Sequence, residues 1–152
     1  MTNHRYTECG LSNVYIHGLE TKIDEDGDEI ITIPAINELH RLIATGIVRH
    51  DKGISGEELR FLRTEMGLTQ AELARLVHRD KQSIGRWERS EVEIDSVAET
   101  VIRLLAIDKL GLEQIGVEEI AVRTVPTAQP QPISINAVAN DSGSKHYELI
   151  AA

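Results

Sequence analysis

The segment Lys81–Arg89 gathers the side chains in this chain that are most suited to reading a nucleic acid. Lys81, Gln82 and Arg86 occur at helical spacing, with the small Gly85 among them, and we expect all four to face outward. Long donors of this kind match the acceptor atoms on guanine and adenine edges in the major groove of DNA. The sequence therefore predicts base contacts from Lys81, Gln82 and Arg86.

The polar residues next to these positions extend the predicted set toward the DNA backbone. Gln70 and Ser83 stand near predicted helix N-termini, where side chains and amide groups meet phosphates. Basic residues are also concentrated in this short stretch. The predicted DNA-binding residues are Gln70, Arg79, Lys81, Gln82, Ser83, Arg86 and Arg89.

Three capped helices are predicted to position these side chains. Ser55 with Glu58, and Thr69 with Glu72, have the spacing of a capping box, and Asp80 can cap a third helix over 81–89. Two short capped helices joined by the tight turn 78–80 must cross steeply, which the small Ala74 permits. Ile84 and Trp87, three residues apart, are expected to point back into the core.

The charge is distributed unevenly along the chain. The formal net charge is -9, but residues 55–90 carry seven Lys/Arg against six Asp/Glu and are the only segment that is not acidic. A small basic face can bind phosphates while acidic flanks limit non-specific DNA binding. Solubility alone would also explain the acidic flanks. Arg41, Arg49 and Lys52 could extend the DNA surface, although lone surface charges explain them too.

The remaining chain predicts a mainly α protein with a small N-terminal β element, an α+β fold. A strand at 13–16 ends before Gly18, and a hairpin joins 19–23 to 29–33 through Asp26-Gly27. An amphipathic helix is predicted over 35–48, with Pro34 in its first turn, and a broadly apolar helix over 94–110. That last helix, with its stripe Val97, Val101, Leu104, Leu105 and Ile107, suits either core closure or dimer formation.

The C-terminal part leaves more than one interpretation open. Residues 124–132 contain three prolines and read as an extended linker, followed by possible strands at 133–138 and 146–152. These strands can fold alone, pair with the N-terminal hairpin, or order on a partner. We divide the chain into an N-terminal β-hairpin region with one helix (1–50), a helix-turn-helix DNA-binding domain (51–111) and a C-terminal linker and tail (112–152), and expect four to five helices in all.

At this level of detail the chain resembles a known family. Leu68–Ala74, reading LTQAELA, and Ser83–Glu88, reading SIGRWE, are similar to the Cro/CI-type (XRE) helix-turn-helix regulators. The order and spacing of Tyr6–Val14, Ile33–Ala44 and Gly56–Arg63 resemble a subgroup related to the MqsA- and HigA-type antitoxins. The resemblance spans about residues 6–110 and excludes the tail.

The resemblance implies roles for individual residues. It implies base contacts from Lys81, Gln82 and Arg86, phosphate contacts from Gln70 and Ser83, and a structural ion pair between Arg63 and Glu88. Two positions depart from the family pattern. Ser90 follows the recognition helix where glycine is frequent, and His78 occupies a turn position that often needs a positive φ, so we expect strain or an altered turn.

Other classes of site find less support in the sequence. Cys9 is the only cysteine, so the paired zinc cysteines of related antitoxins are missing, and its spacing from His4 and His17 fits no usual zinc pattern. The acidic run 24–29 lacks the ligand spacing of a calcium-binding EF-hand loop. Glu88 has no nucleophile or second carboxylate beside it in the sequence. We therefore expect no enzyme, no metal and no cofactor.

These observations together predict a cytoplasmic protein that binds double-stranded DNA. The chain has no apolar run long enough to cross a bilayer, no signal-peptide pattern, and no second cysteine for an intrachain disulfide. We expect a homodimeric repressor that binds a palindromic operator. The alternative is an antitoxin that neutralises a toxin protein through its other segments, above all residues 112–152, while regulating its own operon.

Overall fold

The computed structural model describes residues 2–50, 52–113, 132–139 and 145–150. Within them lie six strands and five helices, in an order that confirms the predicted mainly helical α+β class. The strands are β1 (Thr2–Arg5), β2 (Val14–Leu19), β3 (Thr21–Ile23), β4 (Glu29–Ile31), β5 (Ile133–Ala139) and β6 (Lys145–Leu149). The helices are α1 (Ile36–Arg49), α2 (Gly56–Glu65), α3 (Gln70–Leu76), α4 (Lys81–Glu88) and α5 (Ser96–Leu110).

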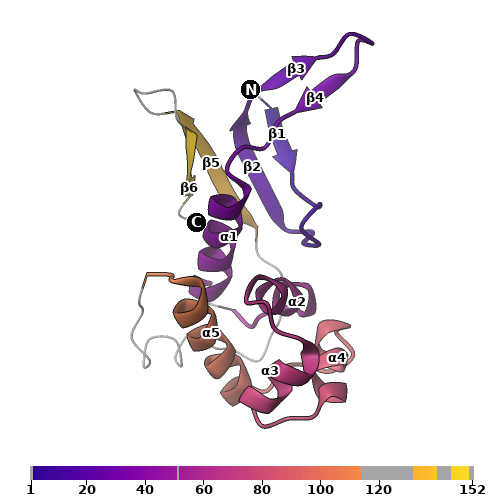
Figure 1. Ribbon diagram of the computed structural model, residues 1–152, viewed down its shortest axis with the longest axis vertical. Coiled ribbons are helices and arrows are strands. Elements are labelled where there is room, and N and C mark those ends of the chain that lie inside the picture. The colour runs from indigo at the N-terminus through magenta and orange to yellow at the C-terminus, as the bar shows by residue number, and fades with distance from the viewer. Residues whose placement is uncertain (1, 51, 114–131, 140–144, 151–152) are drawn as a thin grey trace.

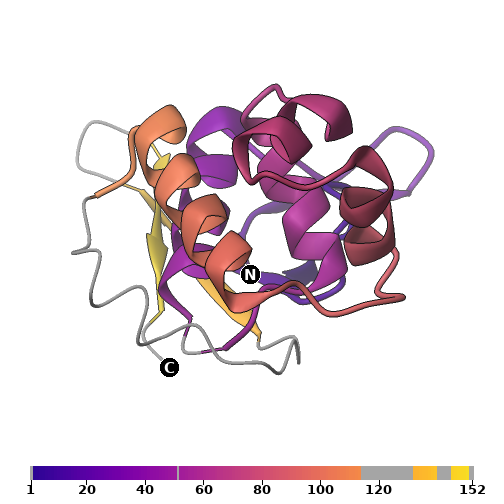
Figure 2. The ribbon, with the colours of Figure 1, turned by 90° about the horizontal axis from the view of Figure 1, so that it is seen from below.

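A four-stranded sheet lies at one end of the molecule and helices α2–α5 lie at the other, with α1 between them (Figures 1 and 2). The strand order is β1-β2-β5-β6. Strand β5 runs parallel to β2, with Val14 opposite Ile133 and Ile16 opposite Ile135, whereas β1 and β6 are antiparallel to their neighbours. Of the possibilities left open for the tail, the structure therefore supports pairing with the N-terminal strands, although the partner is β2 rather than the hairpin.

Helix α1 packs on the apolar face of this sheet. Its buried residues Leu39, Ile43 and Ile47 follow helical spacing, and the predicted helix over 35–48 is confirmed. Gly46 lies so close to the sheet that an added Cβ would sit 3.2 Å from the side chain of Ile133 and 3.4 Å from that of Leu149. The tail strands are thus part of the core around α1. The division into three segments stays a prediction.

The N-terminal β region holds both a confirmed hairpin and a misplaced strand end. Strands β3 and β4 pair antiparallel across the turn that contains Gly27, which has φ 85°, as the Asp-Gly pair predicted. The expected stop before Gly18 is wrong, because β2 continues through it with φ 84°. Glycine adopts this backbone conformation without steric cost. Pro34 precedes the N-cap residue Ala35 instead of lying in the first turn of α1.

Helix α5 buries a face that overlaps the predicted stripe only in part: of the five predicted residues, Ile107 alone is buried. The expected stripe included Val97, yet Val97 is 73% exposed, and Val101, Leu104 and Leu105 are only half-buried. The buried face instead contains Ala98, Ile102 and Ala106, together with Glu99 and Arg103. The Arg103 guanidinium donates to the carbonyls of Val48 (2.6 Å), His50 (3.3 Å) and Lys52, so it caps the end of α1 and the following loop. A buried arginine satisfies these carbonyls where an aliphatic residue could not.

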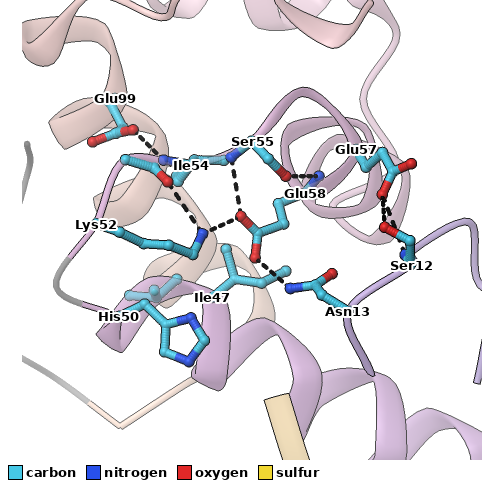
Figure 3. A network of polar contacts seen from close by, with 12 residues as sticks. Ser12, Asn13, Ile47, His50, Lys52, Ile54, Ser55, Glu57, Glu58 and Glu99 are labelled. Atoms are coloured by element: carbon cyan, nitrogen blue, oxygen red, sulfur yellow. Dashed lines mark hydrogen bonds and ion pairs between the residues drawn. The ribbon is translucent and has the colours of Figure 1, made fainter. Parts of the chain in front are cut away.

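A second buried polar cluster joins the first turn of α2 to the sheet (Figure 3). The Glu58 carboxylate, which is fully buried, accepts from Lys52, from the Ser55 backbone N–H (3.0 Å) and from the Asn13 side chain (3.3 Å). Lys52 is itself only 3% exposed, so the suggestion that it extends a DNA surface is wrong. Because a buried charge is costly unless it is paired, this cluster fixes the start of α2 relative to β2.

Candidate nucleic-acid interface

The predicted caps define the helices that carry the candidate DNA-binding side chains. At α2, Ser55 and Glu58 form a reciprocal capping box, and at α3, Thr69 and Glu72 form another. At α4, the Asp80 side chain accepts the Ser83 backbone N–H at 2.7 Å. That hydrogen bond lowers the pKa of Asp80, since the charged carboxylate is the better acceptor. Local sequence signals alone therefore set where α3 and α4 begin.

The inner faces of α3 and α4 pack together in the expected way. Ile84 is fully buried, Trp87 is 5% exposed, and both point into the core as predicted. Leu73 and Ala74 are buried on α3, where the small Ala74 lets the two helices approach closely. This packing fixes which side of α4 faces outward.

Gly56 brings the end of α4 against the start of α2. An added Cβ at Gly56 would lie 2.5 Å from the Glu88 carbonyl oxygen and 2.6 Å from that of Trp87. Real Cβ atoms do not come this close to backbone, so no larger residue fits without a shift of α4. Sequence reasoning had used Gly56 only as part of a family pattern and missed this role.

An ion pair braces α4 from a second side. The Arg63 guanidinium donates to both carboxylate oxygens of Glu88, at 2.6 and 3.0 Å, and to the Leu68 carbonyl at 3.0 Å. The Gln70 amide adds a contact to Glu88 at 3.3 Å. The expected Arg63–Glu88 pair is confirmed, and it ties together α2, the α2–α3 turn, α3 and α4.

The outer face of α4 and the start of α3 line one cleft. Its volume is about 330 Å³, and its lining is made by Gln70, Lys81, Gln82, Gly85, Arg86 and Arg89. Five of these belong to the predicted DNA-binding set, and Lys81, Gln82, Arg86 and Arg89 are exposed. Gly85 is the exception to the expected outward orientation: it is buried, because the Arg89 guanidinium covers it.

The two other predicted residues do not line the cleft. Ser83 is half-buried in the first turn of α4, where its backbone N–H is taken by Asp80. Arg79 forms an ion pair with Asp95, the N-cap of α5, at 2.6 Å. That pair is exposed, so it leaves Arg79 at the surface on the turn before α4. DNA contact by all seven residues stays a prediction.

The comparison with protein families identifies this part of the chain. Residues 56–114 match the family model described as a helix-turn-helix domain. This segment is a helix-turn-helix domain. The comparisons with curated proteins and with solved structures gave no match. In DNA-binding helix-turn-helix domains the second helix of the motif enters the major groove, and the helix in that position here is α4.

Two turns of the helix-turn-helix domain use left-handed backbone at residues other than glycine. His78, between α3 and α4, has φ 57°, and Ser90, after α4, has φ 59°. The expectation of strain at His78 is thus supported by its backbone conformation. Ser90 takes a left-handed conformation that glycine adopts without steric cost.

The N-terminal region holds the helix-turn-helix domain through a further polar chain that sequence reasoning missed. The Tyr6 hydroxyl lies 2.9 Å from His40 Nε2, and His40 Nδ1 lies 2.7 Å from Glu65 at the end of α2. Burial raises the pKa of Tyr6 to about 12, so this hydroxyl keeps its proton. No sequence signal links His40 to Tyr6 and Glu65, which lie 34 and 25 positions away along the chain.

The residues once considered for a metal do not gather. His4 pairs with Glu8, His17 bonds to Asn3, and Cys9 is half-buried against the core. Across the described ranges, no group of three or more His, Cys, Asp or Glu side chains is placed to hold a metal ion. Likewise, none of the helices in those ranges is both long and apolar enough to span a membrane.

Proposed function

We propose that this protein is a sequence-specific transcriptional regulator, a cytoplasmic repressor without enzymatic activity that binds a palindromic operator as a homodimer. The observation that carries the proposal is the exposed row Lys81, Gln82 and Arg86 on a helix held rigidly by Gly56 and the Arg63–Glu88 pair. Donors that are fixed in position can discriminate between bases, whereas mobile ones bind phosphates without discrimination.

The helix α5 supplies a candidate two-fold surface. Val97 is 73% exposed on a face that also holds the half-buried Val101 and Leu104, and apolar surface of this kind favours contact with a second copy. A two-fold dimer would place two copies of α4 in successive major grooves, about 34 Å apart. Sedimentation of a Val97→Glu variant should show monomer, while Val92→Glu, at a residue 53% exposed but outside α5, should leave the dimer intact. Equal dimerisation of both variants would refute this surface.

Binding-site selection from a random duplex library tests the proposed function directly. The purified full chain should enrich a palindromic sequence. The Lys81→Ala variant should bind the enriched duplex about 5- to 100-fold more weakly, as expected for one base contact. Lys109→Ala is the matched control, because Lys109 lies at the end of α5 remote from α4 (Figure 1). Equal binding by the two variants would remove Lys81 from the interface, and no enrichment at any salt concentration would refute the function.

A second candidate is an antitoxin related to the MqsA and HigA type. One observation favours a protein-binding role outside the helix-turn-helix domain: the hairpin β3–β4 exposes Ile23 (76%) and Ile30 (46%) beside the acidic turn 24–28. Deleting the tail would be a poor test, because β5 lies inside the sheet. The sharper test mixes the full chain, or an Ile23→Glu variant, with the product of the neighbouring gene. Binding that is lost only in the variant would support the antitoxin role, and no binding would refute it.

A further inference from the structure

Arg89 occupies an unusual place at the end of the recognition helix α4. It is the C-cap residue, yet its guanidinium folds back along the helix onto Gly85. A Cβ added to Gly85 would lie 3.0 Å from Arg89 Nη1 and 3.7 Å from Arg89 Cζ. Because Gly85 has no side chain, the planar, forked guanidinium of Arg89 can lie against it. This guanidinium, called the Arg89 fork below, lines the cleft on the outer face of α4.

Glu91 holds this fork from the other side. Arg89 Nε donates to Glu91 Oε1 at 3.0 Å, and Arg89 Nη2 lies 3.4 Å from Oε2, so both carboxylate oxygens face the guanidinium. The hydrogen bond and the charge of Arg89 lower the pKa of Glu91, which keeps the carboxylate ionised. Both side chains are more than half exposed, at 61% and 53%. A pair this exposed orients its partners but is weak enough to exchange.

The turn after α4 fixes the position of Glu91. Ser90 takes left-handed backbone with φ 59°, its N–H donates to Trp87 O at 3.0 Å, and the Glu91 N–H donates to Arg86 O at 2.9 Å. These two bonds form a Schellman motif, which returns the chain beside the last turn of the helix. Backbone geometry thus places the Glu91 carboxylate next to the cleft.

We propose that Glu91 is a gate on the DNA-reading surface, a carboxylate that occupies the Arg89 fork until DNA replaces it. The replacing group is a two-acceptor group of DNA, either a guanine edge or a phosphate, because both match the planar fork of arginine as a carboxylate does. Arg89 is then a DNA-contacting residue held ready at the cleft, and Glu91 weakens each complex in which Arg89 contacts the DNA, because it competes for the same guanidinium. This inference rests on the proposed function.

The test compares two neighbouring carboxylates. Glu91→Ala removes the competitor, whereas Glu93→Ala removes an equal charge from an exposed residue two positions further on. Affinities are measured at one fixed salt concentration, on a duplex recovered by the binding-site selection and on a scrambled duplex of the same composition. Glu91→Ala should tighten binding by about three- to fivefold, and Glu93→Ala by less than about twofold. Circular dichroism checks that both variants stay folded.

The Arg89→Ala background completes the cycle. In that background the gain in DNA affinity from Glu91→Ala should fall to the gain from Glu93→Ala, because Glu91 no longer has a guanidinium to bind. If Arg89→Ala weakens only the selected duplex, the exchanged group is a guanine edge, and if it weakens both duplexes equally, it is a phosphate. Equal gains from Glu91→Ala and Glu93→Ala, or a gain that persists without Arg89, would overturn the gate. An unaltered protein that binds no duplex overturns the proposed function, which is a separate result.

Discussion

Removing the Arg63 guanidinium is expected to undock the recognition helix at a large cost in stability. The Glu88 side chain is only 5% exposed and accepts twice from Arg63. In an Arg63→Leu variant that carboxylate still accepts from the Gln70 amide at 3.3 Å. Loss of one partner of a buried ion pair costs about 3–5 kcal/mol, because the other charge is left uncompensated. This is a large part of the roughly 5–15 kcal/mol that holds a small domain folded.

Two further variants, Glu88→Leu and the double variant Arg63→Leu/Glu88→Leu, separate the cost of an unpaired buried charge from the cost of the lost hydrogen bonds. Arg63 is 16% exposed and also donates to Leu68 O, so a Glu88→Leu variant leaves a guanidinium that can still reach solvent and a carbonyl. Its cost should be smaller, about 1–3 kcal/mol. The double variant Arg63→Leu/Glu88→Leu buries no charge, and apolar replacements of buried pairs are often neutral. It should therefore recover at least about 2 kcal/mol relative to the sum of the single changes.

Urea unfolding followed by fluorescence measures these differences directly. Trp87 is the only tryptophan, is 5% exposed and precedes Glu88, so its emission reports whether α4 is docked. The unfolding midpoint should fall most in Arg63→Leu, with an unchanged dependence on urea concentration. A cost below about 1 kcal/mol for Arg63→Leu would refute the idea that this pair braces the recognition helix.

Four further substitutions give predictions, three of them next to α4 and one, Gly46→Ala, a comparison in α1. Gly56→Ala should cost about 1–3 kcal/mol in urea unfolding, because its Cβ would lie 2.5 and 2.6 Å from the Glu88 and Trp87 carbonyl oxygens. Gly46→Ala should cost less, because its Cβ would meet only side-chain atoms, of Ile133 and Leu149, at 3.2 Å or more. His78→Gly should raise the free energy of unfolding by about 1 kcal/mol by relieving left-handed strain, and no gain would contradict that strain. The hydrogen bond from the Ser83 N–H lowers the pKa of Asp80 in the folded protein. The Asp80 cap therefore contributes its full share of the free energy of unfolding above the usual carboxyl pKa of 3.8, and this share is lost as the pH falls through the lower folded value. Acid titration of Asp80→Asn should show less of this loss than the unaltered protein.

The features predictable from sequence are those encoded by neighbouring residues. The capping boxes at Ser55 and Thr69, the cap at Asp80 and the Asp26-Gly27 turn each depend on atoms within a few positions. Such local geometry depends little on the rest of the fold, and so helices α2–α4 and the hairpin were placed correctly.

The features that were missed depend on residues distant along the chain. The parallel pairing of β2 with β5 joins positions 14 and 133, and no local signal specifies a partner at that distance. Arg103 was not expected inside the protein, because the carbonyls that it satisfies belong to α1 and the loop after it. The buried face of α5 was misplaced for the same reason, since it follows those polar contacts as well as apolar periodicity.

The central claim, that α4 reads base sequence, is tested most directly by selecting binding sites with the unaltered protein and with an Arg86→Ala variant in parallel. Arg86 is exposed and lines the cleft on α4. The unaltered protein should enrich a palindrome, and the variant should lose the base preference at one position in each half-site while keeping the rest. Recovery of the same complete motif by both proteins would contradict the claim.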